Sequence, residues 1–549
     1  MASDTPSMGA SKRTSATSGL RNSQTARPVS PHTPQPRSGN HSFASSTSPS
    51  SSFRGEDDAI IFEIGARWLR AGFEGGSAPM CVVGFGPEDS RRAGDYRGWI
   101  QGSTGAGRLP QPVDIEEWTR AYELWRPDSR EVDLSLVEDK IERAFRETYN
   151  QFLLTDAGTS RLVLVLPSLM PHPLLSSLLS TLFSRWRFPS VTLLSSATMS
   201  ATAAGLRSAL VVDLGWAETT ATAIYEYREM TTKRTTRSMK HLMQEMGLLL
   251  TGLASAGNQN TETQNTETAD KISVGFAYCE EVVSRFAWCK SQTEKDTSSD
   301  EPDRKLSIPS PAKPEEEYMD VPFSRLAEPV EKVLFAPGVA EHELDDEEKS
   351  LPLLVYNTLL SLYPDARGTC MSRIVFVGGG SRIPGLRQRV LKEVSLLIDR
   401  HGWSPIRGKA LERQRQRLEE LKLSAQKASK EPETPKSNGE TPSTDDEAAD
   451  PSKAVPEIDF VEQKLRRQNK DIPVPIQGVL REVESLGPWA GASLTTSLKI
   501  RGMVEIEREK FLQHGLAGAT RDVDYPVPDR RSGLRSGGDR SSWTLAGWA

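Results

Sequence analysis

Two acidic residues, each followed two positions later by a glycine, are the side chains of this sequence best placed for chemistry. In the stretch from Ala209 to Tyr225, a short apolar run ends at Asp213, Gly215 follows, and a second run leads away. This pattern predicts a β-hairpin whose tip presents a carboxylate, because glycine tolerates a close backbone approach or a positive φ. No basic residue adjoins Asp213 in the sequence, so a metal ion or a solvated ligand is the expected partner of its charge.

The same pattern occurs earlier in the chain, where an apolar run from Ala59 ends at Glu63 and is followed by Gly65. The two copies lie roughly 150 residues apart, which indicates an internal duplication whose hairpins face one ligand. Each hairpin taken alone also fits an ordinary β-turn. The functional interpretation therefore depends on other residues.

A glycine triplet supplies a third candidate element. The run from Val377 to Ser381 reads Val-Gly-Gly-Gly-Ser, after a predicted strand and before a predicted helix. Glycines let backbone N–H groups approach an anion or a flat base, and a helix N-terminus favours phosphate. The run is neither a dinucleotide-binding fingerprint nor a P-loop, and packing explains it as well as binding does. The candidate contacts are Gly378, Gly379, Gly380 and Ser381.

Strands that alternate with helices surround these motifs, which predicts an α/β fold with parallel pairing. Apolar residues recur every fourth position from Val137 to Leu153, the pattern of a helix packed on a core. The run 161–166 is continuously apolar, as in a central strand covered on both faces. Residues 86–112 are a loop rich in Gly, Arg and Pro. Further helices are expected at 174–186, 197–204, 237–250, 274–290, 322–335, 351–362 and 386–397.

Composition limits the class of protein. The chain has 549 residues, a net charge of −6 and four scattered cysteines without CxxC spacing. These values argue against a broad nucleic-acid footprint, a disulfide framework and a cysteine metal site. No apolar run approaches the roughly 20 residues of a membrane span, so we expect a soluble, intracellular protein. Disordered or polar segments are expected at 1–56, 255–270, 291–317, 405–458 and 516–549.

Together the two acidic hairpins and the triplet occur in the order seen in the actin, Hsp70 and sugar-kinase superfamily. Their flanks resemble actin-related proteins: 68–79 is similar to actin's first hairpin, 224–226 to the end of its second, and 489–494 with 504–515 to its C-terminal segment. The resemblance implies a two-lobed, actin-like ATPase fold made of duplicated ribonuclease-H-like domains. It covers 57–515, with a first lobe of 57–204 and 487–515 and a second lobe of 205–486.

The resemblance also implies a ligand, ATP or ADP with Mg²⁺, held between the lobes by one hairpin from each. Arg70 takes the place of the family's phosphate-contacting lysine and keeps its charge. Asp213 corresponds to the acid near the metal. The implied cofactor-binding residues are Glu63, Gly65, Arg70, Asp213, Gly215, Gly378, Gly379, Gly380 and Ser381.

Departures from the family pattern fall on the residues that hold phosphate or carry out hydrolysis. Thr220 stands where the family has its catalytic histidine, and Ser196 stands where it has the glutamine that positions the attacking water. Losing both orienting side chains predicts a pseudo-ATPase with no catalytic residue, because water orientation is a large part of phosphoryl-transfer catalysis. The other replaced positions hold Ala66, Arg67, Trp216 and Ala217.

The segment between Gly86 and Glu116 is short for an actin, and we identify no DNase-binding-loop domain in it. A subunit without that domain is expected to cap a filament but not to polymerise. Among actin-related proteins the chain is most similar to the subunit of the dynactin pointed-end complex, with fungal-looking inserts. This resemblance implies a cytoplasmic, cytoskeletal protein that caps the actin-like minifilament and supports dynein-driven transport. Its implied partners are the filament subunits and other pointed-end subunits, with no nucleic acid or membrane.

Two other functions stay open on the sequence. An active ATPase or sugar kinase of the same superfamily would need a general-base aspartate, and no clear candidate is present, while Trp216 would crowd the phosphates. A nuclear actin-related subunit of a chromatin-remodelling complex would suit the polar inserts, but no basic nuclear-localisation run stands out.

Overall fold

The computed structural model divides the chain into two compact units, 1–53 and 54–549, and every residue that it describes belongs to the second. The predicted tail at 1–56 and insert at 405–458 lie outside the described residues, as do nearly all of 255–270 and the chain after 521. The structure describes residues 59–87, 111–128, 130, 132–157, 160–256, 271–291, 304–311, 318–339, 343–403, 478–500, 504–518 and 520–521.

A seven-stranded sheet contains the first acidic hairpin. Its strand order is β15-β14-β6-β5-β1-β2-β3, with β1, β5 and β6 parallel to one another and the remaining pairs antiparallel. The expected parallel pairing is thereby confirmed for its centre. The strands are β1 (Ile60–Ile64), β2 (Trp68–Phe73), β3 (Cys81–Gly84), β5 (Leu162–Leu166), β6 (Ser190–Ser195), β14 (Val504–Glu507) and β15 (Thr520–Arg521).

Helices cover both faces of this sheet, which explains why β1 and β5 are buried at every position and why Glu63 is the only polar residue in the two strands. On one face Phe62 stacks on Phe145 of α3, with 4.4 Å between ring centroids. On the other face Ile61 and Val163 pack with Trp489 of α14. The helices are α3 (Leu134–Glu147), continued by a π-helical turn to Leu153, α4 (His172–Thr181), continued likewise to Trp186, α5 (Ser196–Ala203), α14 (Pro488–Ser497) and α15 (Arg508–His514).

A four-stranded sheet contains the second acidic hairpin. Its order is β13-β7-β8-β9, where β13 runs parallel to β7 and the other pairs are antiparallel. The core of this half contains Leu210 and Val212 of β7 together with side chains of the helices around the sheet. These strands are β7 (Ala209–Leu214), β8 (Thr219–Tyr225), β9 (Arg228–Thr235) and β13 (Ile374–Val377).

The helices of this second half begin close to where the sequence predicts them. A 3-10 turn at Phe323–Ala327, α8 (Glu328–Val330) and a π-helical turn at Glu331–Phe335 together form the helical stretch expected at 322–335. Among the described residues, no helix is both long and apolar enough to cross a membrane. The remaining helices are α6 (Met239–Ala256), α7 (Phe276–Phe286), α9 (Leu351–Leu360), α10 (Pro364–Met371) and α11 (Leu386–His401).

Two short strands lie in segments that the sequence assigns to inserts or tails. Residues 305–309 form β11 (Lys305–Pro309), which pairs with β12 (Tyr318–Pro322), although 291–317 reads as a polar insert. The buried Ile308 and Val321 explain the pairing, because they join the core of the second half. Thr520 of β15 pairs with Glu505 of β14, inside the predicted tail.

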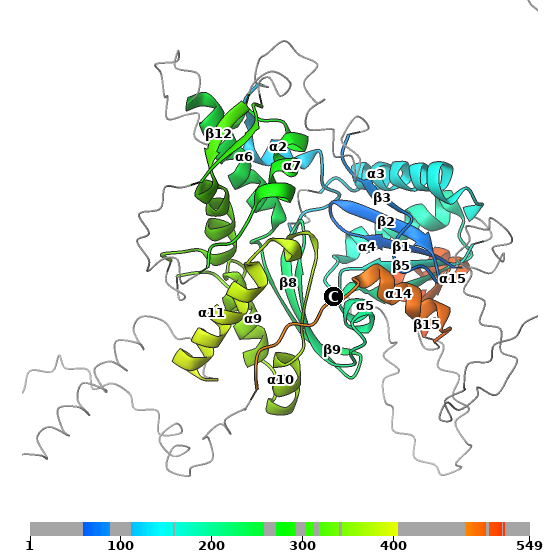
Figure 1. Ribbon diagram of the computed structural model, residues 1–549. Coiled ribbons are helices and arrows are strands. Elements are labelled where there is room, and N and C mark those ends of the chain that lie inside the picture. Colours follow the sequence, from blue (N-terminus) through cyan, green and yellow to red (C-terminus); the bar gives the residue numbers. More distant parts are fainter. Residues whose placement is uncertain are drawn as a thin grey trace, which may run out of the picture. The chain divides into compact units, whose positions relative to one another are not determined.

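Residues 113–126, called here the bridging segment, contact both halves of the structure. The sequence places them in the first lobe, but β4 (Val113–Asp114) pairs with β10 (Lys271–Ile272) of the second half. The following helix, α2 (Ile115–Arg120), contacts α6, and Trp118 donates a hydrogen bond of 2.9 Å to the carbonyl of Val274. Figure 1 shows α2, in cyan, beside α6 and α7. This segment therefore ties the two halves together.

Candidate functional site

The two acidic hairpins form as the sequence predicts. In the first, Glu63 lies opposite Arg70, and the Gly65 N–H donates to the Trp68 carbonyl at 2.9 Å. In the second, Asp213 lies opposite Thr220. A Cβ on Gly215 would lie 2.7 Å from the Glu218 carbonyl oxygen, so this turn requires glycine.

The glycine triplet lies against the second hairpin. Val377 of β13 pairs in parallel with Asp213, and Gly378 follows with φ +85° and ψ 171°. A Cβ on Gly378 would overlap the Asp213 carboxylate, and one on Gly380 would lie 2.7 Å from the Met239 sulfur. These two glycines therefore allow close packing of the chain on the hairpin.

Gly379 and Ser381, the other two candidate contacts in this stretch, differ in exposure. The Ser381 hydroxyl is buried and donates a 2.8 Å hydrogen bond to the carbonyl of Gly378, which closes the turn locally. Gly379 is exposed, and a Cβ there would meet nothing within 4 Å. In this structure Gly379 is thus the member of the triplet with open space above it.

The predicted charged residues are brought together. Arg70 forms an ion pair with Glu63 across the first hairpin. Burial, which is the largest cause, and the nearby Glu63 carboxylate together raise the pKa of Asp213 to about 6, against the opposing effect of Arg70. The positive group near Asp213 is therefore Arg70 of the other hairpin. The sequence neighbours of Asp213, by contrast, suggest a metal ion or a solvated ligand as its partner. Within the described residues, no group of three or more His, Cys, Asp or Glu side chains is placed to hold a metal ion.

The raised pKa of Asp213 predicts how stability depends on pH. The folded chain holds this proton more tightly than the unfolded chain, so the stabilisation is complete below about pH 4 and is lost as the pH rises through about 6. We expect Asp213→Asn to increase the free energy of unfolding at pH 7 by about 1–3 kcal/mol and to flatten the pH dependence between about 4 and 6. Urea unfolding at several pH values measures both effects.

Asp399→Asn is the matched control, because Asp399 lies exposed on α11. It is expected to change stability by less than about 0.5 kcal/mol. A loss of stability at pH 7 in Asp213→Asn would contradict the prediction and indicate that the carboxylate holds a cation.

Each of the two turns carries a large side chain, and the two side chains lie close to each other. Arg67 lies in the first turn and is only 3% exposed, and Trp216 lies in the second turn. The Arg67 Cζ atom lies 4.1 Å from the Trp68 ring centroid and 6.0 Å from that of Trp216. Both positions hold small or acidic residues in the family that the sequence resembles. The space between the turns is therefore lined by rings and a guanidinium.

More aromatic rings complete this group. Tyr122 of the bridging segment stacks on Phe276 of α7 at 3.7 Å between centroids, and each ring centroid lies 5.3 Å from the Arg67 Cζ atom. Glu280 lies 3.4 Å from the Arg67 guanidinium. The sequence identifies Arg67 as a departure from the family pattern and Trp216 as a departure that would crowd the phosphates. Their size at turn positions was the available signal, whereas nothing local pointed to Tyr122, Phe276 or Glu280.

Buried polar contacts join the bridging segment to both hairpins. The Leu124 N–H donates to the Ala66 carbonyl of the first turn at 2.7 Å. Glu123 is 4% exposed and accepts hydrogen bonds from the Trp216 indole at 3.3 Å and the Lys240 ammonium at 3.4 Å. Arg126 donates a shorter bond of 2.7 Å to the same carboxylate, so the buried charge of Glu123 is compensated and Trp216 is bonded to the bridging segment.

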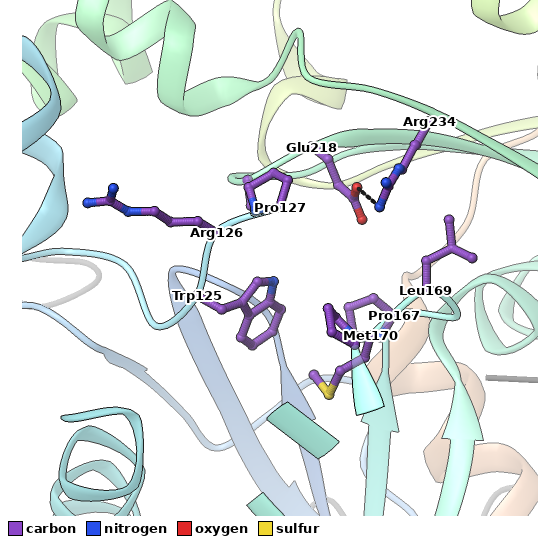
Figure 2. Close-up of a pocket in the computed structure, with 10 residues that line it drawn as sticks. Trp125, Arg126, Pro127, Pro167, Leu169, Met170, Glu218 and Arg234 are labelled. Atoms are coloured by element: carbon purple, nitrogen blue, oxygen red, sulfur yellow. Dashed lines mark ion pairs between the residues drawn. The ribbon is translucent and has the colours of Figure 1, made fainter. Parts of the chain in front are cut away.

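A small pocket lies beside the second hairpin (Figure 2). Glu218 and Arg234 face each other across 3.8 Å on one side, and Trp125, Pro167 and Met170 line the other side. Burial raises the pKa of Glu218 to about 7, while Arg234 lowers it. Neither Thr220 nor Ser196 lines this pocket, so it is not the hydrolytic site implied by the resemblance.

The implied nucleotide and its cation do not fit the residues between the turns. A phosphate grip needs backbone amides and small side chains facing the anion. Here the amide of Gly65 is bonded within its turn, and Arg67 and Trp216 project from the two turn positions and pack together. Arg70, the implied phosphate contact, is paired with Glu63.

Comparison with known proteins gives a consistent relationship. A family model described as actin matches residues 54–416, which include both hairpins and the glycine triplet. Actin-related protein 2 of Saccharomyces cerevisiae is 25% identical over 250 residues, covering 45% of this chain and 59% of that protein. Actin-related protein 2 of Arabidopsis thaliana is 22% identical over 349 residues, covering 61% of this chain and 81% of that protein.

Proposed function

The chain belongs to the actin family, and on that premise we propose that it is a structural subunit of an actin-like assembly without significant ATP hydrolysis. The observation that carries this proposal is the contact of Arg67 with Trp216 between the two acidic turns. Side chains from both turns pack together in the space that the family resemblance assigns to the nucleotide phosphates. Thr220 and Ser196 add to the argument, because their hydroxyls lack the imidazole and the amide of the histidine and glutamine that they replace.

The bridging segment supports a capping role. After β3 ends at Gly84, the chain returns at Val113 and pairs at once with Ile272 of the same chain. Trp118 and Phe276 then pack together at 5.0 Å between centroids. The residues that follow the short 86–112 segment are thus engaged within the molecule, and this favours a subunit that ends a filament over one that extends it.

The finer part of the proposal is membership of the dynactin pointed-end complex. It rests on the resemblance of the sequence and on the capping features described above. We propose that the partners are the subunits of the actin-like minifilament and the other pointed-end subunits, in the cytoplasm. The relatives named actin-related protein 2 support the proposal only at the coarser level of an actin-related protein.

Affinity purification of the tagged full-length protein from cells that express it tests the assembly. Dynactin subunits are expected in the purified material. Recovery of chromatin-remodelling subunits without dynactin subunits would contradict the proposal and favour the nuclear alternative.

A phosphate-release assay tests the absence of hydrolysis separately. The purified chain with Mg²⁺ and ATP is expected to release no more phosphate than a heat-denatured sample of the same protein. Steady release at about 1 s⁻¹ or faster, the range of ordinary enzymes, would show an active ATPase and overturn the pseudo-enzyme assignment.

A further inference from the structure

Arg67 is buried in a setting made by four different parts of the fold. The group defined here as the Arg67 cluster consists of Arg67 and Trp68 at the first hairpin, Tyr122 in the bridging segment, Trp216 at the second hairpin, and Phe276 and Glu280 on α7. The first hairpin belongs to the seven-stranded sheet, while Trp216 and α7 belong to the other half. The cluster therefore spans both halves.

The chemistry of the cluster suits a permanent contact. A guanidinium stacks well on aromatic faces and is less strongly hydrated than an ammonium, so arginine is the cation best suited to burial among rings. Glu280, 3.4 Å away, supplies the opposite charge. A Cβ on Gly84, at the end of β3, would lie 2.9 Å from Nη1 of Arg67, so a glycine there leaves room for the guanidinium.

The cluster is reinforced on both sides. Tyr122 precedes two residues that are themselves hydrogen-bonded. Glu123 accepts a hydrogen bond from the Trp216 indole, and the Leu124 N–H donates to the backbone of the first turn. On the far side, the backbone N–H of Lys240 donates to the Trp216 carbonyl at 3.0 Å, and its ammonium lies 3.0 Å from Glu116 of α2. The bonds made by Glu123, Leu124 and Glu116 join the bridging segment to the two halves, and the bond between Lys240 and Trp216 holds α6 against the second hairpin within one half.

We propose that the Arg67 cluster replaces the nucleotide as the group that joins the two halves, so that their closed arrangement does not depend on ATP, ADP or Mg²⁺. A ligand that bridges two halves stabilises the closed state by its contacts to both. Here the chain supplies those contacts itself through Arg67, Tyr122 and Trp216. This inference deepens the proposed lack of hydrolysis and is independent of the dynactin assignment.

Hydrogen exchange of the full-length protein tests the proposal through amides of α2 and the N-terminal half of α7, with amides of β5 as the internal reference. In the wild type, exchange at these helices is expected to be the same with Mg²⁺ and ATP, with ADP, and with EDTA. In Arg67→Ala, exchange there is expected to become about tenfold faster while β5 is unchanged, because loss of the cluster opens the contact locally. Arg67→Lys keeps the charge but loses the planar stacking. Its exchange rate at α2 and α7 is expected to lie between those of the wild type and Arg67→Ala.

Arg207→Ala is the matched control, because Arg207 is exposed and forms a surface ion pair with the exposed Glu226, 3.5 Å away. It is expected to exchange like the wild type at every reported amide. Slower exchange of α2 and α7 on addition of Mg²⁺ and ATP to the wild type would overturn the proposal, as would wild-type exchange in Arg67→Ala. If Arg67→Ala does not fold, Arg67→Lys and the wild-type comparison decide. Failure here would leave the co-purification and phosphate-release results standing, so the two proposals are separable.

Discussion

Replacement of Gly378 by alanine is expected to lower the free energy of unfolding by roughly 3 kcal/mol or more, combining backbone strain with overpacking. The residue has φ +85° and ψ 171°, a region that is almost restricted to glycine. The added Cβ would also lie 2.5 Å from the Leu214 carbonyl oxygen and closer still to the Asp213 carboxylate. These atoms belong to backbone and to a short side chain, so they cannot move aside easily. Urea unfolding of the purified variant measures the loss.

Gly379→Ala is the matched control for that experiment, since the two glycines are adjacent. A Cβ on Gly379 meets nothing within 4 Å, and its φ lies outside the glycine-only region. We expect a change within about 0.5 kcal/mol. Equal losses in the two variants would contradict the view that Gly378 is required for contact with Asp213.

Gly491→Ala is expected to be the second strongly destabilising change, by about 3 kcal/mol or more if the helices cannot separate. Gly491 lies in α14 where this helix crosses α5. A Cβ there would lie 2.7 Å from the Met199 carbonyl carbon, closer still to its oxygen, and 3.2 Å from the Ala203 nitrogen. Because α14 also covers β1 and β5, moving it would uncover Ile61 and Val163. A lower midpoint in thermal unfolding is the measurement.

Gly252→Ala provides the contrast, as a glycine to alanine change inside α6 where a Cβ meets nothing within 4 Å. It is expected to stabilise the protein by about 0.5–1 kcal/mol through helix propensity alone. A stable, well-folded Gly491→Ala protein with an unchanged midpoint would show that α14 can shift on α5 without loss, against the packing described above.

The parts of the fold that follow from the sequence are those set by local pattern. The hairpins at Glu63 and Asp213 could be predicted because apolar runs and turn glycines lie within a few residues of each other. The helix through Val137 and Phe145 could be predicted from its spacing, and β5 from its unbroken apolar run. A helix that buries one side shows apolar residues at every fourth position, and a short strand that is covered on both faces is apolar throughout. Both patterns can be read from neighbouring residues alone.

The parts that the sequence does not predict depend on contacts between distant residues. The strand β4 has two residues and pairs with Lys271 and Ile272, so no periodicity marks it. The partner of Tyr122 is Phe276, which lies on another helix far along the chain. The candidate site shows the same division: its acids and glycines were assigned locally, whereas the pairing of Arg70 with Glu63 close to Asp213 required the structure.

The seven-stranded sheet is built from both ends of the described chain, and this has a consequence during synthesis. Val191 of β6 pairs with Ile506 of β14, so the outer edge of β6 stays unpaired until the ribosome has made the C-terminal segment. At typical elongation rates the delay is roughly 15–60 s. During that time the face later covered by Trp489 is also open. A chain that terminates early therefore keeps a bare strand edge and an apolar face, the features that lead nascent proteins to aggregate or be degraded.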